Sequence, residues 1–392
     1  MRSIITKLRM QCYTYAMSYY LANRAVLKWL EIPSVYQIAK DELYELDNAS
    51  FSFLKKCASS DGCASKNSAF IDYCLGEGLL TTTPGVVRGP ALKQAPVPSL
   101  RYLELQITDV CNLRCRHCYI GDTGRSELTP EEVRRILREF EEMQGLRVLI
   151  TGGEPLVHSK FHEINEMLPD FFIRKVLFTN GVLLKKEELK SLKVEEIQVS
   201  IDGLDVAHDK LRGSGTFKRS LKAMEHAQDA GFDVSVSTMV HQYNKEDFDE
   251  MEQLFKKMGI KDWTVDIPCR TGRLKENEEL FVSPEESGKY LGYGYGNGLH
   301  SSTQGYGCGL HLVAVMANGS IAKCSFYGDQ PVGSIDHGLK TAWSKIQPVR
   351  LKDLECDCEY LEVCRGGCRY RAELLGGKGG KDPYRCKLYG IL

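Results

Sequence analysis

Strand-like and helix-like segments alternate six times between residue 101 and about residue 268. The strand-like runs are 102–107, 147–151, 174–179, 196–201, 233–239 and 262–267, and the amphipathic stretches between them are 130–143, 159–170, 185–192, 217–230 and 246–258. This order predicts an α/β fold, in which a parallel sheet is built with right-handed helical crossovers. Ligands of such folds bind at the carboxyl ends of the strands, so the residues that follow each strand are the first to consider.

The first strand-like run leads into a short loop that contains three cysteines. They follow the spacing C-x3-C-x2-C, in the segment Cys111-Asn112-Leu113-Arg114-Cys115-Arg116-His117-Cys118. Three thiolates on one tight loop can hold three corners of a 4Fe–4S cluster, which leaves the fourth iron open to a small molecule. Zinc sites usually combine a C-x2-4-C pair with a second pair or with histidines, so zinc fits this loop less well.

This loop resembles that of the radical S-adenosylmethionine (radical SAM) enzymes. The resemblance implies a partial (β/α)6 TIM-like barrel, assigned here to residues 101–290, with a 4Fe–4S cluster on Cys111, Cys115 and Cys118. In that family the open iron chelates S-adenosylmethionine (SAM), and reductive cleavage gives methionine and a 5′-deoxyadenosyl radical. An electron donor such as flavodoxin or ferredoxin is therefore an expected partner.

The next strands end in residues that suit SAM. The second ends in Gly152-Gly153-Glu154-Pro155, where glycine lets the backbone approach a ligand and Glu154 can accept from an ammonium group. This segment resembles the family motif that holds the SAM amino group. Ser200 and Asp202 are two residues apart, so a strand would place both on one face, at positions that reach the ribose in relatives. The resemblance also implies SAM-binding roles for His117, Asn180 and Arg212, with Arg219 as an alternative to Arg212.

Seven further cysteines follow a Gly/Tyr-rich loop at 292–307. Their pattern is C-x10-G-x4-C followed by C-x-C-x5-C-x3-C-x17-C, with Gly319 as the glycine. It resembles the SPASM domain, an auxiliary iron–sulfur domain of radical SAM maturases, and assigns residues 291–392 to such a domain. The C-x-C pair, Cys356 and Cys358, departs from the C-x2-C of that family, which puts its cluster geometry in doubt.

The SPASM resemblance implies two auxiliary clusters. The first would be held by Cys308, Cys324 and Cys368, and the second by Cys356, Cys358, Cys364 and Cys386. The first set is one ligand short, because relatives carry an extra cysteine shortly before the first, where this chain has Ser302. Cys269 is a distant candidate; an open iron, another ligand type or a smaller cluster are the other options. Two structural zinc sites are the competing interpretation of the array.

The N-terminal part, residues 1–85, is predicted to be a small α+β domain joined by a Thr/Pro/Gly-rich linker at 86–100. Residues 1–35 are predicted to be helical, Tyr36–Leu46 to form a hairpin, and Ala49–Cys57 and Asn67–Leu80 to be amphipathic helices. This order resembles the winged-helix domain that captures leader peptides of ribosomally made peptides. A plain structural cap on the barrel is the alternative, and the sequence leaves both open.

The composition limits which partners are expected. The net charge is −1, so nothing points to nucleic acid. The sequence contains no run of about 18 apolar residues, so no membrane-spanning helix is expected. Fifteen cysteines in 392 residues fit a metal-binding protein of the reducing cytoplasm better than a secreted disulfide scaffold.

The sequence therefore predicts a radical SAM enzyme that abstracts hydrogen from its substrate. The first hypothesis for the substrate is a ribosomally made peptide or protein that is cross-linked or oxidised. A haem- or tetrapyrrole-pathway enzyme is the second hypothesis, and a non-catalytic iron–sulfur electron carrier is the third. The SAM motifs argue against the third, and a leader-binding domain at 36–85 would favour the first.

Overall fold

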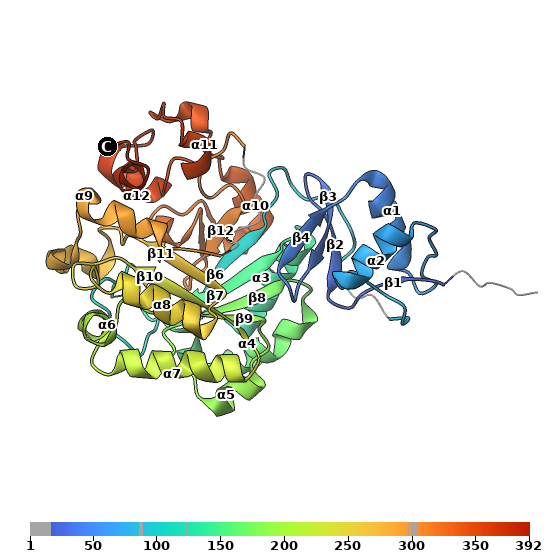
Figure 1. Ribbon diagram of the computed structural model, residues 1–392, viewed down its shortest axis with the longest axis horizontal. Helices are drawn as coiled ribbons and strands as arrows, with labels where there is room; N and C mark the ends of the chain where they lie inside the picture. The colour runs from blue at the N-terminus through green and yellow to red at the C-terminus, as the bar shows by residue number, and fades with distance from the viewer. Residues whose placement is uncertain (1–16, 86–88, 123, 297, 299–303) are drawn as a thin grey trace, which may run out of the picture. The chain divides into compact units, whose positions relative to one another are not determined.

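The computed structural model describes residues 17–85, 89–122, 124–296, 298 and 304–392. The chain divides into two compact units (Figure 1). The N-terminal unit contains the chain up to Lys28 and Ile32–Gly89, and the barrel unit contains Trp29–Glu31 and Pro90–Leu392. Among the described residues, no helix is both long enough and apolar enough to span a membrane.

The N-terminal unit is built on a three-stranded sheet in the order β2-β3-β4. Its strands are β2 (Ala25–Trp29), β3 (Pro33–Gln37) and β4 (Glu42–Glu45); the helices are α1 (Asn48–Cys57) and α2 (Ser68–Gly76), and β1 (Tyr20–Leu21) pairs with β5 (Leu80–Thr81). Asp47 caps α1 and Asn67 caps α2, because each side chain accepts a backbone N–H of the first turn. The predicted hairpin and both predicted helices are therefore present, with β3 and β4 antiparallel.

The helix predicted over residues 1–35 is wrong in its described part, which contains β1, β2 and β3. A sheet is favoured here because burial alternates along Val26, Leu27, Lys28 and Trp29. The next strand also carries branched and aromatic side chains, which suit a strand. Residues 1–16 lie outside the described residues. The predicted linker is also partly structured, because residues 90–100 belong to the barrel unit. Ser99 is fully buried and donates its backbone N–H and its hydroxyl to the Glu31 carboxylate.

The barrel unit contains six consecutive parallel strands in the order β11-β10-β9-β8-β7-β6. They are β6 (Tyr102–Thr108), β7 (Arg147–Gly152), β8 (Arg174–Thr179), β9 (Glu196–Ser200), β10 (Asp233–Met239) and β11 (Asp262–Asp266). The helices between them are α3 (Pro130–Glu142), α4 (Phe161–Met167), α5 (Lys186–Ser191), α6 (Asp205–Arg212), α7 (Thr216–Asp229) and α8 (Phe248–Met258). The predicted partial (β/α)6 barrel is confirmed, and α6 is an element that the sequence did not predict.

Burial on both faces explains the apolar character of these strands. Leu105, Val148, Leu177, Val199 and Val236 all belong to one core with the inner faces of the helices. The first crossover helix begins as predicted: Thr129 and Glu132 form a capping box around Pro130.

The C-terminal part continues the barrel sheet. The strand β12 (Leu312–Val315) lies parallel to β6, and β13 (Ser320–Ala322) and β14 (Gly333–Ser334) follow antiparallel, which gives a nine-stranded sheet. The remaining helices are short: α9 (Pro284–Ser287), α10 (Leu339–Lys345), α11 (Leu361–Cys364), α12 (Arg369–Gly376) and α13 (Pro383–Leu388). Gly319, at φ +79°, lies in the turn from β12 to β13, and Cys324 follows β13.

Candidate active site

A cavity of about 270 Å³ opens at the carboxyl ends of the barrel strands. Its walls include nine of the side chains or glycines that the sequence singled out: Cys111, Cys115, His117, Cys118, Gly152, Gly153, Asn180, Ser200 and Arg212. Glu154 and Asp202 are not among the lining residues. The structure thus gathers most of the predicted SAM-binding residues around one space and leaves two of them behind its walls.

The cysteine loop is held against the end of β7 by backbone contacts. The Gly153 N–H donates to the Thr108 carbonyl at 2.8 Å, and the Glu154 N–H donates to the Val110 carbonyl at 2.9 Å. A Cβ on Gly153 would lie 2.4 Å from the Val110 oxygen, and one on Gly152 would lie 2.4 Å from the Thr108 oxygen. The glycines are therefore needed for the loop to dock, in addition to any approach to a ligand.

Burial opposes ionisation of the thiols in this loop. It raises the pKa of Cys111 to about 11, an effect that the Leu113 N–H partly offsets by donating to the sulfur at 3.4 Å. Burial also raises the pKa of Cys115, while the Arg212 guanidinium acts in the opposite direction. Because iron binds the thiolate form, loading of a cluster must release protons here. Arg273, which the sequence did not single out, also contacts this loop. Its side chain donates to the Cys115 carbonyl, and its backbone N–H donates to the Cys118 carbonyl.

Glu154 is fully buried and bonds to the end of β8. Its carboxylate accepts the Thr179 hydroxyl and the Asn180 N–H, each at 2.8 Å. Burial raises its pKa to about 7, although these donors pull in the other direction. The Asn180 side chain lines the cavity and donates to Asn112 in the cysteine loop at 2.8 Å. Glu154 therefore positions Asn180 and joins two strand ends.

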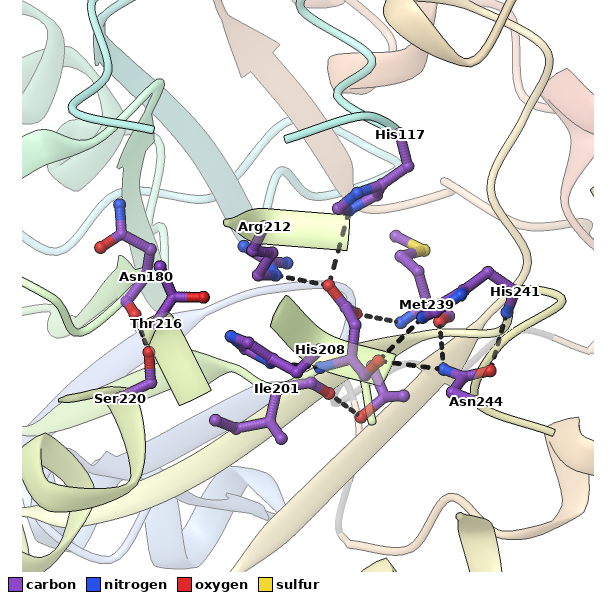
Figure 2. Close-up of polar contacts among 12 residues, drawn as sticks. His117, Asn180, Ile201, His208, Arg212, Thr216, Ser220, Met239, His241 and Asn244 are labelled. Carbon is purple, nitrogen blue, oxygen red and sulfur yellow. Dashed lines mark hydrogen bonds and ion pairs between the residues drawn. The ribbon is translucent and has the colours of Figure 1, made fainter. Parts of the chain in front are cut away.

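Asp202 organises a second buried group, just beyond the end of β9. Its carboxylate accepts Arg212 Nε at 2.5 Å and the Met239 N–H at 2.7 Å, and it lies 3.7 Å from His117 Nε2. In Figure 2 the dashed lines from Arg212 and His117 meet at one carboxylate oxygen, which is Asp202 Oδ2. Burial alone would raise the pKa of Asp202, but Arg212 and His117 outweigh it and hold the pKa below its usual range. Asp202 lies two residues beyond the end of β9 and, unlike Ser200, does not line the cavity, so the predicted shared face is not observed.

Two histidines that the sequence analysis missed complete this group (Figure 2). His208 Nδ1 accepts the Asp202 N–H at 3.1 Å, and the His241 ring lies 2.8 Å from the Asp202 carbonyl. Burial lowers the pKa of both, to about 4 for His208. A signal was available, because His208 and Arg212 are four residues apart and so share a helix face. Arg219 instead makes an exposed bond to the Gly215 carbonyl.

Glu104 is a further residue that the sequence analysis missed. It lines the cavity and a second one of about 410 Å³, and it accepts the Ser325 N–H at 2.7 Å and hydroxyl at 2.5 Å. Burial raises its pKa. An acidic residue within the apolar run Tyr102–Thr108 was the available signal. Glu104 thus connects the barrel interior to the loop that follows Cys324.

The C-terminal cysteines fall into two groups. Cys386 is close enough to Cys356, Cys364 and Cys358 for their charges to add to the effect of burial in raising its pKa. Cys308, Cys324 and Cys368 line the second cavity, and Cys368 packs in one cluster with Cys269 and Cys324. Ser302 lies outside the described residues.

The donor set fits iron–sulfur clusters. All fourteen described cysteines are free of disulfides. Within the described ranges, no three Cys, His, Asp or Glu side chains stand close enough to hold a single metal ion. Cysteine thiolates are the usual protein ligands of iron–sulfur clusters, so these free thiols suit such clusters.

Comparison with known proteins places this geometry in context. A sequence profile of the Radical SAM superfamily matches residues 105–255. The chain is 32% identical to the mycofactocin maturase MftC of Mycobacterium ulcerans (strain Agy99), over 74% of this chain and 88% of that protein. It is 29% identical to the AdoMet-dependent heme synthase of Methanosarcina barkeri (strain Fusaro / DSM 804), over 73% of this chain and 95% of that protein.

A solved structure shares the fold. SuiB of Streptococcus suis, solved bound to S-adenosylmethionine, matches with a TM-score of 0.66 and 15% identity, over 93% of this chain and 99% of that chain. The same protein bound to the precursor peptide SuiA matches with a TM-score of 0.65 and 14% identity, over 93% and 98%. A share of 93% is larger than the barrel unit alone can supply, so the likeness extends into the N-terminal unit.

Proposed function

The chain belongs to the radical SAM superfamily, and from that premise we propose that it cross-links or oxidises a ribosomally made peptide. Radical SAM enzymes use SAM and a 4Fe–4S cluster, and the cysteine loop of this chain is the site that suits the cluster. When bound, the two supply a radical that abstracts hydrogen from the substrate. A donor such as flavodoxin or ferredoxin delivers the electrons in the cytoplasm.

The protein's own residues bind and orient the cofactor. Cys111, Cys115 and Cys118 hold the cluster as thiolates. Arg212 lines the cavity and is held on one edge by Asp202, so its guanidinium suits the SAM carboxylate. Ser200 and Asn180 line the cavity with hydroxyl and amide groups that suit the remaining polar groups of SAM. Both Asp202 and Glu154 act behind this surface as positioning residues.

Apolar walls restrict water around the reacting groups. Leu113, Phe178, Met239 and Phe326 line the cavity, together with the neutral ring of His117. Burial lowers the pKa of His117 to about 3, so the ring stays uncharged at neutral pH. A dry, mostly apolar wall protects a reactive intermediate from side reactions with solvent.

The N-terminal unit carries the peptide part of the proposal. It forms its own small sheet, and within the described residues no strand pairs with the outer edge of β4. An incoming peptide strand gains main-chain hydrogen bonds at such an edge. Support also comes from MftC, whose name describes a maturase, and from the fold shared with SuiB, which was solved with a precursor peptide.

A haem- or tetrapyrrole-pathway enzyme is the second candidate, and the heme synthase relative favours it. The alignments with the heme synthase and with MftC each leave about a quarter of this chain without a counterpart, so this share does not separate the two candidates. The fold likeness to SuiB, which was solved with a precursor peptide, spans 93% of this chain and favours the first candidate.

The first experiment identifies the substrate. The genes next to that of the enzyme are searched for a short precursor peptide, the reduced enzyme is incubated with SAM and that peptide, and the product is analysed by mass spectrometry. We expect the peptide to lose a pair of hydrogen atoms as 5′-deoxyadenosine accumulates. Turnover of an iron tetrapyrrole, with no change in the peptide, would instead establish the second candidate.

A second experiment examines the β4 edge. The Leu46 N–H donates to the Pro33 carbonyl, so strand alternation turns the Glu45 N–H toward the outer edge. Glu45→Pro removes this donor but leaves the β3–β4 ladder, whereas Glu45→Ala keeps the donor. The proline variant should bind the peptide up to about tenfold more weakly than the alanine variant, the effect of one backbone hydrogen bond. Equal dissociation constants would contradict strand addition at this edge.

A further inference from the structure

Cys269 stands apart from the C-terminal array in the sequence but not in the fold. It lies shortly after the end of β11, on the barrel. Its side chain is 4% exposed and packs in a small cluster with Cys324, Cys368 and the rings of Tyr327 and Tyr370. A barrel residue therefore lies within the group of cysteines predicted for the first auxiliary cluster.

Arg371 explains how the two parts are brought together. This buried side chain of α12 donates to the Asp266 carboxylate and the Ile267 carbonyl at the end of β11, both at 2.9 Å. It also donates to the Asp382 carboxylate at 2.7 and 3.1 Å. Asp382 in turn accepts the Cys368 N–H at 2.9 Å. One guanidinium thus links the backbone before Cys269 to the backbone of Cys368.

Packing gathers the four thiols. Cys269, Cys324 and Cys368 belong to one packed cluster. Cys308 lines the second cavity together with Cys324 and Cys368, so these two cysteines are common to both sets. Cys74 is a buried cysteine outside this array, in the core of the N-terminal unit, where Cys57 and Cys63 lie in the same cluster.

The position of Cys269 between two cavities adds to the argument. Cys269 lines the active-site cavity, together with Cys118 of the SAM-cluster loop. Cys308, Cys324 and Cys368 line the second cavity, and Phe326 lines both. A group held by all four cysteines would therefore stand at the wall between the SAM site and the C-terminal region.

We propose that Cys269 is the fourth protein ligand of the first auxiliary cluster, which it holds with Cys308, Cys324 and Cys368. The proposal rests on the proposed presence of that cluster. It accounts for Ser302 at the position where relatives carry their extra cysteine, because the barrel supplies the ligand instead. A cluster with four thiolates has no open iron for a substrate, so its role is electron transfer at the edge of the active-site cavity.

The test uses the full chain with Cys111, Cys115 and Cys118 replaced by Ala, so that only auxiliary clusters remain. Cys269→Ala, Cys308→Ala and Cys386→Ala are compared in this background, with Cys74→Ala as the matched buried control. Each protein is reconstituted anaerobically, its iron is counted, and the dithionite-reduced form is examined by electron paramagnetic resonance. Cys269→Ala should lose or shift the same signal as Cys308→Ala and keep the signal that Cys386→Ala removes.

Two results would overturn the proposal. Cys269→Ala with the iron content and spectrum of Cys74→Ala, while Cys308→Ala loses a signal, would show that Cys269 is an inert buried thiol. A background protein without iron would remove the auxiliary clusters and the proposal together, and SAM cleavage by the native chain would show whether the proposed function survives. Should Cys269→Ala fail to fold, Cys269→Ser decides, because oxygen ligation shifts the same signal whereas an inert site leaves it unchanged.

Discussion

The SAM-cluster loop and the C-terminal cysteine array are assembled in opposite ways. The loop takes its three cysteines from eight consecutive residues, Cys111–Cys118, and docks through backbone contacts with β7. The array draws on cysteines from Cys308 to Cys386, to which we propose that the barrel adds Cys269, and buried side chains such as Arg371 hold these segments together. A local site is fixed mainly by its own spacing, whereas a distributed site depends on residues far from any thiol.

The largest effect is expected in the local site. Replacing Cys111, Cys115 and Cys118 with Ala should abolish 5′-deoxyadenosine formation, because no other trio of cysteines has this spacing. If each of three sites holds four irons, the variant should keep about two-thirds of the iron. Anaerobic reconstitution, followed by iron analysis and a dithionite-driven SAM cleavage assay, measures both quantities. Undiminished cleavage would refute the loop as the SAM-cluster site, and stoichiometric zinc in place of iron would refute the auxiliary clusters.

The next effect should distinguish the distributed site from the local one. Arg371→Met leaves Asp382, which is 2% exposed, without its main cation. Breaking such a buried pair costs about 3–5 kcal/mol, so the free energy of unfolding should fall by this amount. The iron of the first auxiliary site should fall more than that of the SAM-cluster loop, because the β11 end is released from Cys368. Urea unfolding and iron analysis report the two effects.

Arg270→Met is the control for this variant. Arg270 lies on the same segment, its side chain is 55% exposed, and its ion pair with Glu278 is long, at 4.0 Å. Its substitution should change stability and iron content little. If both variants lose the same iron, the array does not depend on the Arg371 bridge.

The same contrast explains what the sequence could predict. The six barrel strands were predictable because they are long, apolar and separated by amphipathic helices such as α3. The loop at Cys111–Cys118 was predictable because its spacing is local. In contrast, α6 has eight residues and no side-chain cap, so little in its own sequence marks a helix. The short strands β12–β14 take their stability from pairing with β6 and with each other, which only the assembled sheet provides.

Within the candidate site, residue types were easier to predict than residue roles. The sequence placed Glu154 and Asp202 at strand ends, where acids can bind a ligand. Their hydrogen bonds go instead to Asn180 and Arg212, partners that only the tertiary fold brings within reach. Arg371 acts in the array in the same way, and no motif marked it.

Glu154 sharpens the comparison, because it belongs to a local motif but acts through a distant strand. Burial raises its pKa from the ordinary 4.5 to about 7 in the folded chain. Between these pH values the folded chain holds a proton that the unfolded chain has released. Stability contributed by this group is therefore present below about pH 4.5 and should fall by roughly 3 kcal/mol as the pH rises to about 7.

Glu154→Gln imitates the protonated carboxyl group and should remove most of that pH dependence. The measurement is urea unfolding from pH 4.5 to pH 7, in the variant that lacks Cys111, Cys115 and Cys118, so that no cluster contributes at the SAM site. Glu131→Gln, at an exposed position of α3, is the matched control and should keep the parent's slope. Parallel curves for the parent and for Glu154→Gln would mean that Thr179 and Asn180 stabilise the ionised carboxylate fully, and that the end of β8 does not depend on a proton at Glu154.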